Sequence, residues 1–98
     1  MKRKILQLSV AEPWYSMLAS GEKKEEYRDI KPYWIKRLCV NDNCNVFKPY
    51  THVLFINGYG AARPHVMFRI KEICIGKPHV EWCPASMLCE DKFIIRLK

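Results

Sequence analysis

Apolar and polar positions along the chain follow the period of strands in several short stretches. Leu6, Leu8 and Val10 fall on one face of the first stretch, and Ile5, Gln7 and Ser9 fall on the other. The predicted strands are, in chain order, Lys4–Val10, Lys24–Arg28, His52–Asn57, Val66–Cys74 and Phe93–Leu97. The alternation of the fourth strand slips at Glu72–Ile73, which predicts either a β-bulge or the end of that strand.

Helical spacing of apolar residues appears early in the chain. Pro13 suits the first turn of a helix, and Gly21 suits its C-cap because glycine tolerates a positive φ. A second helix is predicted to begin near Pro32, and a third, short one at Pro84–Cys89. The apolar stripes of the first two are Trp14, Met17 and Leu18, and Trp34, Ile35 and Leu38.

This order of elements predicts one α+β domain, mainly β, over residues 1–98. The helices are too few and too clustered for alternating βαβ units, so the strands are expected to form a small, partly closed β-barrel with two or three short helices. The chain has 98 residues, which is one domain's worth, and 49% of them are hydrophobic, which suffices for one core.

The net charge and the cysteine content indicate which binding partners and which cellular compartment to expect. Seventeen Lys and Arg against ten Asp and Glu give a net charge of +7, which favours polyanions such as nucleic acid, although a basic surface without a partner is the alternative. Five cysteines, an odd number without a C-x-x-C pair, indicate a reducing, cytoplasmic compartment. Their spacing to the histidines matches no common zinc site, so no metal or other cofactor is expected. No stretch has the ~20 apolar residues of a membrane helix, so no membrane partner is expected either.

Residues 21–28 carry the strongest chemical pattern. Glu26 and Arg28 project to one side of the predicted strand, and Lys23 lies at the helix-to-strand turn, where it can bend over that side. The two cations favour an ionised Glu26, which is a good hydrogen-bond acceptor for a base amino group and a poor general acid. The alternative is a solvated, salt-bridged edge strand of little energetic weight.

The spacing of these residues resembles the signature of the ASCH domains, a branch of the PUA-like superfamily. Gly21, Lys23, Glu26 and Arg28 fill every fixed position of G-x-K-x-x-E-x-R, and the resemblance extends over roughly residues 4–74. It implies a PUA-like barrel with a cleft beside the signature, in a protein that binds RNA or handles nucleotides. Some relatives resemble acetylcytidine amidohydrolases, which have Thr where this chain has Glu26, so the same route of hydrolysis is not expected here.

Two functions are preferred at this stage, and a third possibility is an interaction domain with a protein partner, which a large exposed apolar patch would favour. As a binding domain, the chain would hold RNA, a nucleotide or a nucleoside through Lys23, Glu26, Arg28, Tyr59 and Arg63. As a hydrolase acting on a modified nucleoside or on RNA, it would use Lys23 as base or nucleophile and Glu26 to orient water or bind the base. Tyr59 would stack on a base or cover the barrel end, and Trp14 would be core or a stacking platform. Arg63, Arg69 and Lys71 would extend a phosphate track or be scattered surface charge.

Overall fold

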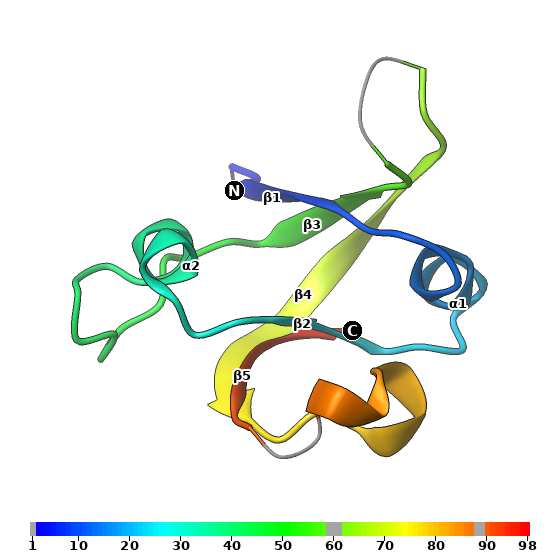
Figure 1. Ribbon diagram of the computed structural model, residues 1–98. Helices are drawn as coiled ribbons and strands as arrows, with labels where there is room; N and C mark the ends of the chain where they lie inside the picture. The colour runs from blue at the N-terminus through cyan, green and yellow to red at the C-terminus, as the bar shows by residue number, and fades with distance from the viewer. Residues whose placement is uncertain (1, 59–61, 88–89) are drawn as a thin grey trace.

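A five-stranded mixed sheet organises the chain (Figure 1). The computed structural model describes residues 2–58, 62–87 and 90–98. Its elements are β1 (Ile5–Ser9), α1 (Trp14–Ser20), β2 (Glu25–Arg28), α2 (Pro32–Leu38), β3 (His52–Ile56), β4 (His65–Gly76), the 3-10 helices η1 (Val80–Trp82) and η2 (Ala85–Met87), and β5 (Lys92–Leu97). Every predicted strand and both predicted α-helices are present, and η2 falls within the predicted third helix.

The strand order is β1-β3-β4-β5-β2, with β1 and β3 parallel and all other neighbours antiparallel. The long strand β4 pairs first with β3 and then with β5, and its register shifts between Ile70 and Glu72. The predicted bulge is therefore confirmed close to its expected place. The alternative, that the strand ends there, is wrong because β4 continues to Gly76.

The two edge strands, β1 and β2, are not neighbours in this order, so the sheet stays open over the described residues. The α+β class, mainly β, is confirmed, whereas the predicted small, partly closed β-barrel is not. No helix in the described parts of the chain is long and apolar enough to cross a membrane.

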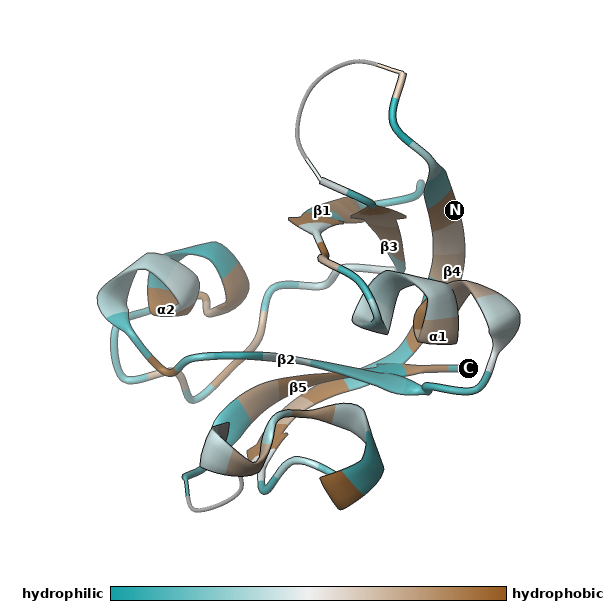
Figure 2. Cartoon of the chain, turned by 45° about the vertical axis from the view of Figure 1, so that its right-hand side comes forward, coloured by the Kyte–Doolittle hydropathy of each residue, from teal (hydrophilic) through white to brown (hydrophobic). Residues whose placement is uncertain are grey.

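The main core lies between the sheet and the two α-helices. Leu6, Leu8, Val53 and Phe55 from β1 and β3 are at most 2% exposed, and each helix adds buried leucine. A second, smaller cluster of Tyr27, Cys83 and Ile94 packs residues of β2 and β5 against the segment of η1 and η2. Figure 2 shows β2 as the most hydrophilic strand of this largely apolar sheet, although part of it is buried.

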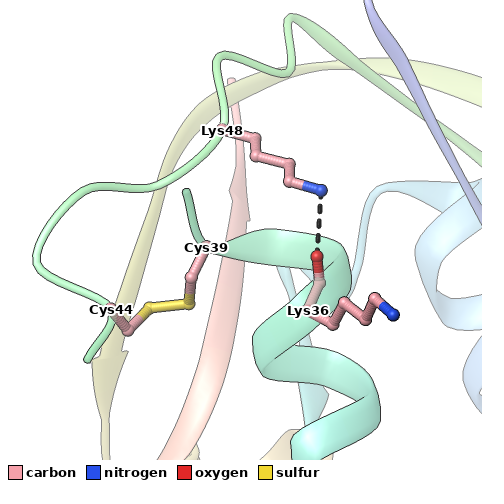
Figure 3. Close-up of a disulfide and its surroundings, with 4 residues drawn as sticks. All are labelled: Lys36, Cys39, Cys44 and Lys48. Carbon is pink, nitrogen blue, oxygen red and sulfur yellow. Dashed lines mark hydrogen bonds between the residues drawn. A yellow bond between two sulfur atoms is a disulfide. The ribbon is translucent and has the colours of Figure 1, made fainter. Parts of the chain in front are cut away.

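Cys39 and Cys44 form a disulfide at the end of α2 (Figure 3). The expected reducing, cytoplasmic compartment is not supported by this bond, because disulfides are rare in reducing compartments. Lys48 Nζ donates to the carbonyl of Lys36 at 2.9 Å and ties the following loop to the helix. The disulfide and this hydrogen bond fix the C-terminal end of α2.

Reduction of this disulfide is expected to lower the free energy of unfolding by about 2 kcal/mol, because the bond closes a short loop in the unfolded chain. Urea denaturation with and without a thiol reductant measures the change. The Cys44→Ala variant is the control, since its midpoint should not respond to reductant. A wild-type midpoint that does not move on reduction would contradict the prediction.

Candidate functional site

The signature segment begins where α1 ends. Gly21 adopts φ 88°, a left-handed conformation that favours glycine, and its N–H donates to the carbonyl of Leu18. The chain then turns back, and the N–H of Lys23 donates to the carbonyl of Met17 at 2.9 Å. This turn directs the Lys23 side chain under the helix, where it is 2% exposed. Local chain geometry thus explains how a lysine comes to lie in the interior.

Lys23, Glu26 and Arg28 form one buried ionic cluster. Lys23 Nζ donates to Glu26 Oε1 at 2.7 Å, and Arg28 Nη1 donates to Glu26 Oε2 at 2.6 Å. The three side chains are 2%, 6% and 16% exposed in that order. β2 is a salt-bridged edge strand, as the alternative expected, but these three charges are not solvated, because they are largely buried and matched with each other.

Aromatic rings surround the ammonium group of Lys23. Its Nζ lies 5.0 Å from the ring centroid of Trp14 and 5.4 Å from that of Tyr27. The faces of such rings attract cations and partly replace lost hydration. Trp14 therefore serves two purposes, since it packs on the main core and also faces the ionic cluster.

Arg28 connects the two edge strands of the sheet. Its Nη1 also donates to the carbonyl of Tyr27, and its Nη2 donates to the carbonyl of Ser9, the last residue of β1, at 2.9 Å. The guanidinium lies 5.2 Å from the ring centroid of Trp34 on α2. One side chain thus links β1, β2 and α2, and Glu26 holds it in place.

A cavity of about 690 Å³ lies beside this link. It is lined by Gln7, Leu8, Ser9, Arg28, Tyr33, Trp34, Arg37 and Ile56. Arg37 Nη2 donates to the carbonyl of Gln7 at 3.0 Å, and its guanidinium lies 5.2 Å from the Trp34 ring. The sequence interpretation missed Arg37 and Tyr33 and assigned Trp34 to the core. Tyr33 and Trp34 lie four and three residues before Arg37, and this helical spacing is the signal that could have grouped them on one face of the helix.

A second cavity, of about 140 Å³, lies on the other side of Arg28. Its lining consists of Trp14, Lys23, Glu26, Tyr27, Arg28, Trp82, Cys83 and Pro84. Lys23 and Glu26 therefore border this smaller space, whereas Arg28 borders both. The three signature residues are brought together as predicted. The cavity that all three border is the smaller one, and its lining includes aromatic side chains.

The other predicted site residues do not line these two cavities, as far as the structure describes them. Tyr59 is outside the described residues. Arg63 is exposed and lines neither of these two cavities. Its guanidinium lies close to Gly58, about 3.7 Å from where a Cβ on that glycine would stand. Arg69 and Lys71 are exposed on β4 and do not line them either. Ser9 borders the larger cavity.

Directly after β2, Asp29 pairs with Lys92 of β5. Lys92 Nζ donates to Asp29 Oδ1 at 2.6 Å, and Lys92 is 7% exposed while Asp29 is 40% exposed. The hydrogen bond from Lys92 lowers the pKa of Asp29, and the same bond raises the pKa of Lys92. The pair fastens the end of the signature strand to its neighbour.

This pair predicts a specific pH dependence. Because the folded pKa of Asp29 is lowered, its stabilisation is complete above the ordinary value of 3.8 and is lost as pH falls through the folded pKa. Lys92, with a raised pKa, loses its contribution only in strongly alkaline solution.

We expect Asp29→Asn to lower the free energy of unfolding at pH 7 by about 1 kcal/mol, a small effect because the carboxylate is partly screened by solvent. Denaturation from pH 7 to pH 2 should show a shallower acid loss in this variant than in the Asp42→Asn control. Equal acid losses in the two would contradict it.

The described residues contain no group of three or more His, Cys, Asp or Glu side chains that could hold a metal ion.

No family model matches the chain, and neither a curated protein nor a solved structure with significant similarity was found. The site must therefore be interpreted from its own geometry.

Proposed function

We propose that this chain is an ASCH-type, PUA-like domain that binds RNA or a nucleotide where Arg28 links the two edge strands, β1 and β2. The observation that carries the proposal is the position of Arg28. Its guanidinium is held by Glu26 at 2.6 Å while it also lines a cavity of about 690 Å³. A fixed guanidinium in a concave site is suited to bind phosphate.

The composition of the cavity supports the same class of ligand. Arg28 and Arg37 supply positive charge, while Tyr33 and Trp34 supply aromatic surface. Nucleic-acid sites that bind single strands combine these two features, since phosphates need cations and bases stack on rings. The net charge of +7 adds a long-range attraction for such ligands.

The link between the edge strands supports the PUA-like assignment. Arg28 Nη2 bonds to the carbonyl of Ser9, so a side chain spans the gap that a closed barrel would bridge with backbone hydrogen bonds. We propose that this side-chain seam between β1 and β2 takes the place of backbone pairing in a partly closed, PUA-like barrel, and that the ligand binds at the seam.

Titration with mixed single-stranded RNA oligomers and with nucleoside monophosphates tests the proposal. Affinity should fall with added salt by roughly one counterion for each phosphate contacted. Arg28→Gln should weaken binding, whereas Arg69→Gln, the same change on an exposed residue of β4, should leave it nearly unchanged. Absence of binding by any of these ligands at low salt would refute the proposed function.

A hydrolase acting on a modified nucleoside or on RNA is the second candidate. It rests on the smaller cavity, which both Lys23 and Glu26 border and which has room for one ring-sized group. Lys23 Nζ already donates to Glu26 Oε1 at 2.7 Å, so an attack by this amine on a substrate would first have to break that contact. Turnover of a panel of acylated nucleosides and RNA substrates without added metal, abolished by Lys23→Ala, would favour this candidate. An inactive panel would leave binding as the better account.

A further inference from the structure

The backbone of β1 presents one edge to the larger cavity. Val10 N–H donates to the carbonyl of Ile56 on β3, and successive residues of an extended strand direct their backbone groups to opposite edges. The backbone groups of Gln7 and Ser9 therefore point away from β3. Their carbonyls accept from Arg37 and Arg28, which agrees with this direction.

The two arginines leave this edge rich in donors. They occupy the carbonyls of Gln7 and Ser9, while the N–H groups of these two residues point to the same side. Among the residues that the structure describes, no carboxylate lines the cavity, and Glu26, the partner of Arg28, already accepts from Lys23 and Arg28. The polar lining that remains for a ligand is therefore dominated by guanidinium and amide N–H groups, which are suited to bind an anion.

Aromatic side chains border the same space. Trp34 lies beneath both guanidinium groups, and Tyr33 packs edge-on against Trp34 with ring centroids 4.9 Å apart. Tyr33 is 62% exposed, and the Arg37 guanidinium lies 5.9 Å from its ring centroid, so an accessible aromatic ring stands beside a cation at the cavity. The volume of about 690 Å³ lies within the ordinary range of small-molecule sites.

We propose that the larger cavity binds a terminal phosphate carried by a nucleotide, with the phosphate held by Arg28, Arg37 and the Gln7–Ser9 edge and the base stacked at Tyr33. This inference rests on the proposed function and specifies its ligand. A phosphomonoester offers about −1.5 to −2 charges and three acceptor oxygens, whereas an internal phosphodiester offers one charge and two free oxygens. The larger number of acceptors suits this cluster of donors. A free nucleotide and the phosphorylated end of an RNA strand share this chemistry.

Calorimetric titration with matched ligand pairs tests the inference. The pairs are AMP with adenosine, and a 5′-phosphorylated RNA decamer with the 5′-hydroxyl decamer of the same sequence. We expect the phosphorylated member of at least one pair to bind about tenfold tighter or more, because charge-assisted hydrogen bonds are the strong ones. A preference within the AMP pair alone identifies a free nucleotide, and a preference within the RNA pair identifies a strand end.

Variants of α2 locate the effect. Arg37→Gln should abolish the preference for phosphate, and Arg37→Lys, which keeps the charge but not the two-pronged geometry, should reduce it. Lys36→Gln removes the same charge from an exposed neighbour on the same helix and should keep the preference. Denaturation curves of all three variants should match that of the wild type closely enough to establish that the fold is retained.

Two results would overturn the inference and are distinguishable. If wild-type protein binds RNA or nucleotides but does not prefer the phosphorylated members, or if Arg37→Gln and Lys36→Gln weaken binding equally, the cavity is not a phosphate site and the proposed function still holds. If the wild-type protein binds none of the four ligands, the inference and the proposed function both fail.

Discussion

Replacing Glu26 with glutamine is expected to lower the free energy of unfolding by about 3–5 kcal/mol. The substitution keeps the size of the side chain but removes the charge that Lys23 and Arg28 share. Lys23 is only 2% exposed, so its ammonium would remain buried without a counter-charge. Since a small domain is stable by only about 5–15 kcal/mol, the loss would be a large part of the total. Urea denaturation at neutral pH gives the measurement.

Two controls separate this effect from a general loss of charge. Glu22→Gln changes an exposed glutamate of the same segment and should alter the free energy of unfolding by less than about 0.5 kcal/mol. The double variant Lys23→Met with Glu26→Gln should recover part of the loss, because removing both partners leaves no unpaired ammonium. A loss in Glu26→Gln no larger than in Glu22→Gln would show that the cluster does not exist in solution.

Arg28→Lys is expected to weaken ligand binding at least tenfold and to lower the free energy of unfolding by about 1–3 kcal/mol. Lysine keeps the charge, but a single ammonium group cannot reproduce the fork that reaches Glu26, the Tyr27 carbonyl and the Ser9 carbonyl together. Titration with the ligand identified for the wild type and urea denaturation measure the two effects.

The matched control for this variant is Arg69→Lys, the same substitution at an exposed position of β4. It should leave both affinity and stability nearly unchanged. If Arg28→Lys binds as tightly as Arg69→Lys, the guanidinium of Arg28 does not contact the ligand, and net charge alone accounts for binding.

The sequence predicted the ionic cluster well because its geometry is local. Lys23, Glu26 and Arg28 lie within six residues, and a capped helix followed by a strand determines how they project. The bulge in β4 was likewise visible as a break in local alternation. Their common burial also follows from this order, since the turn after Gly21 carries Lys23 beneath α1.

The larger cavity could not be predicted in the same way. Its contacts join residues far apart in the chain, with a sequence separation of 19 for Ser9 and Arg28 and of 30 for Gln7 and Arg37. Only the tertiary packing of α2 against β1 brings Tyr33, Trp34 and Arg37 to this place. The disulfide was missed for another reason, because an odd number of cysteines was interpreted as a reason against any pairing, although a single pair is compatible with an odd total.

The most direct measurement of the central claim is a backbone NMR titration of the ¹⁵N-labelled protein with AMP and with the 5′-phosphorylated RNA decamer. We predict that the amide signals of Gln7, Ser9, Arg28 and Arg37 move most for at least one ligand, because the ligand binds at the seam between β1 and β2. Shifts concentrated instead at exposed cations of β4, such as Arg69 and Lys71, would contradict the account and leave only a basic surface.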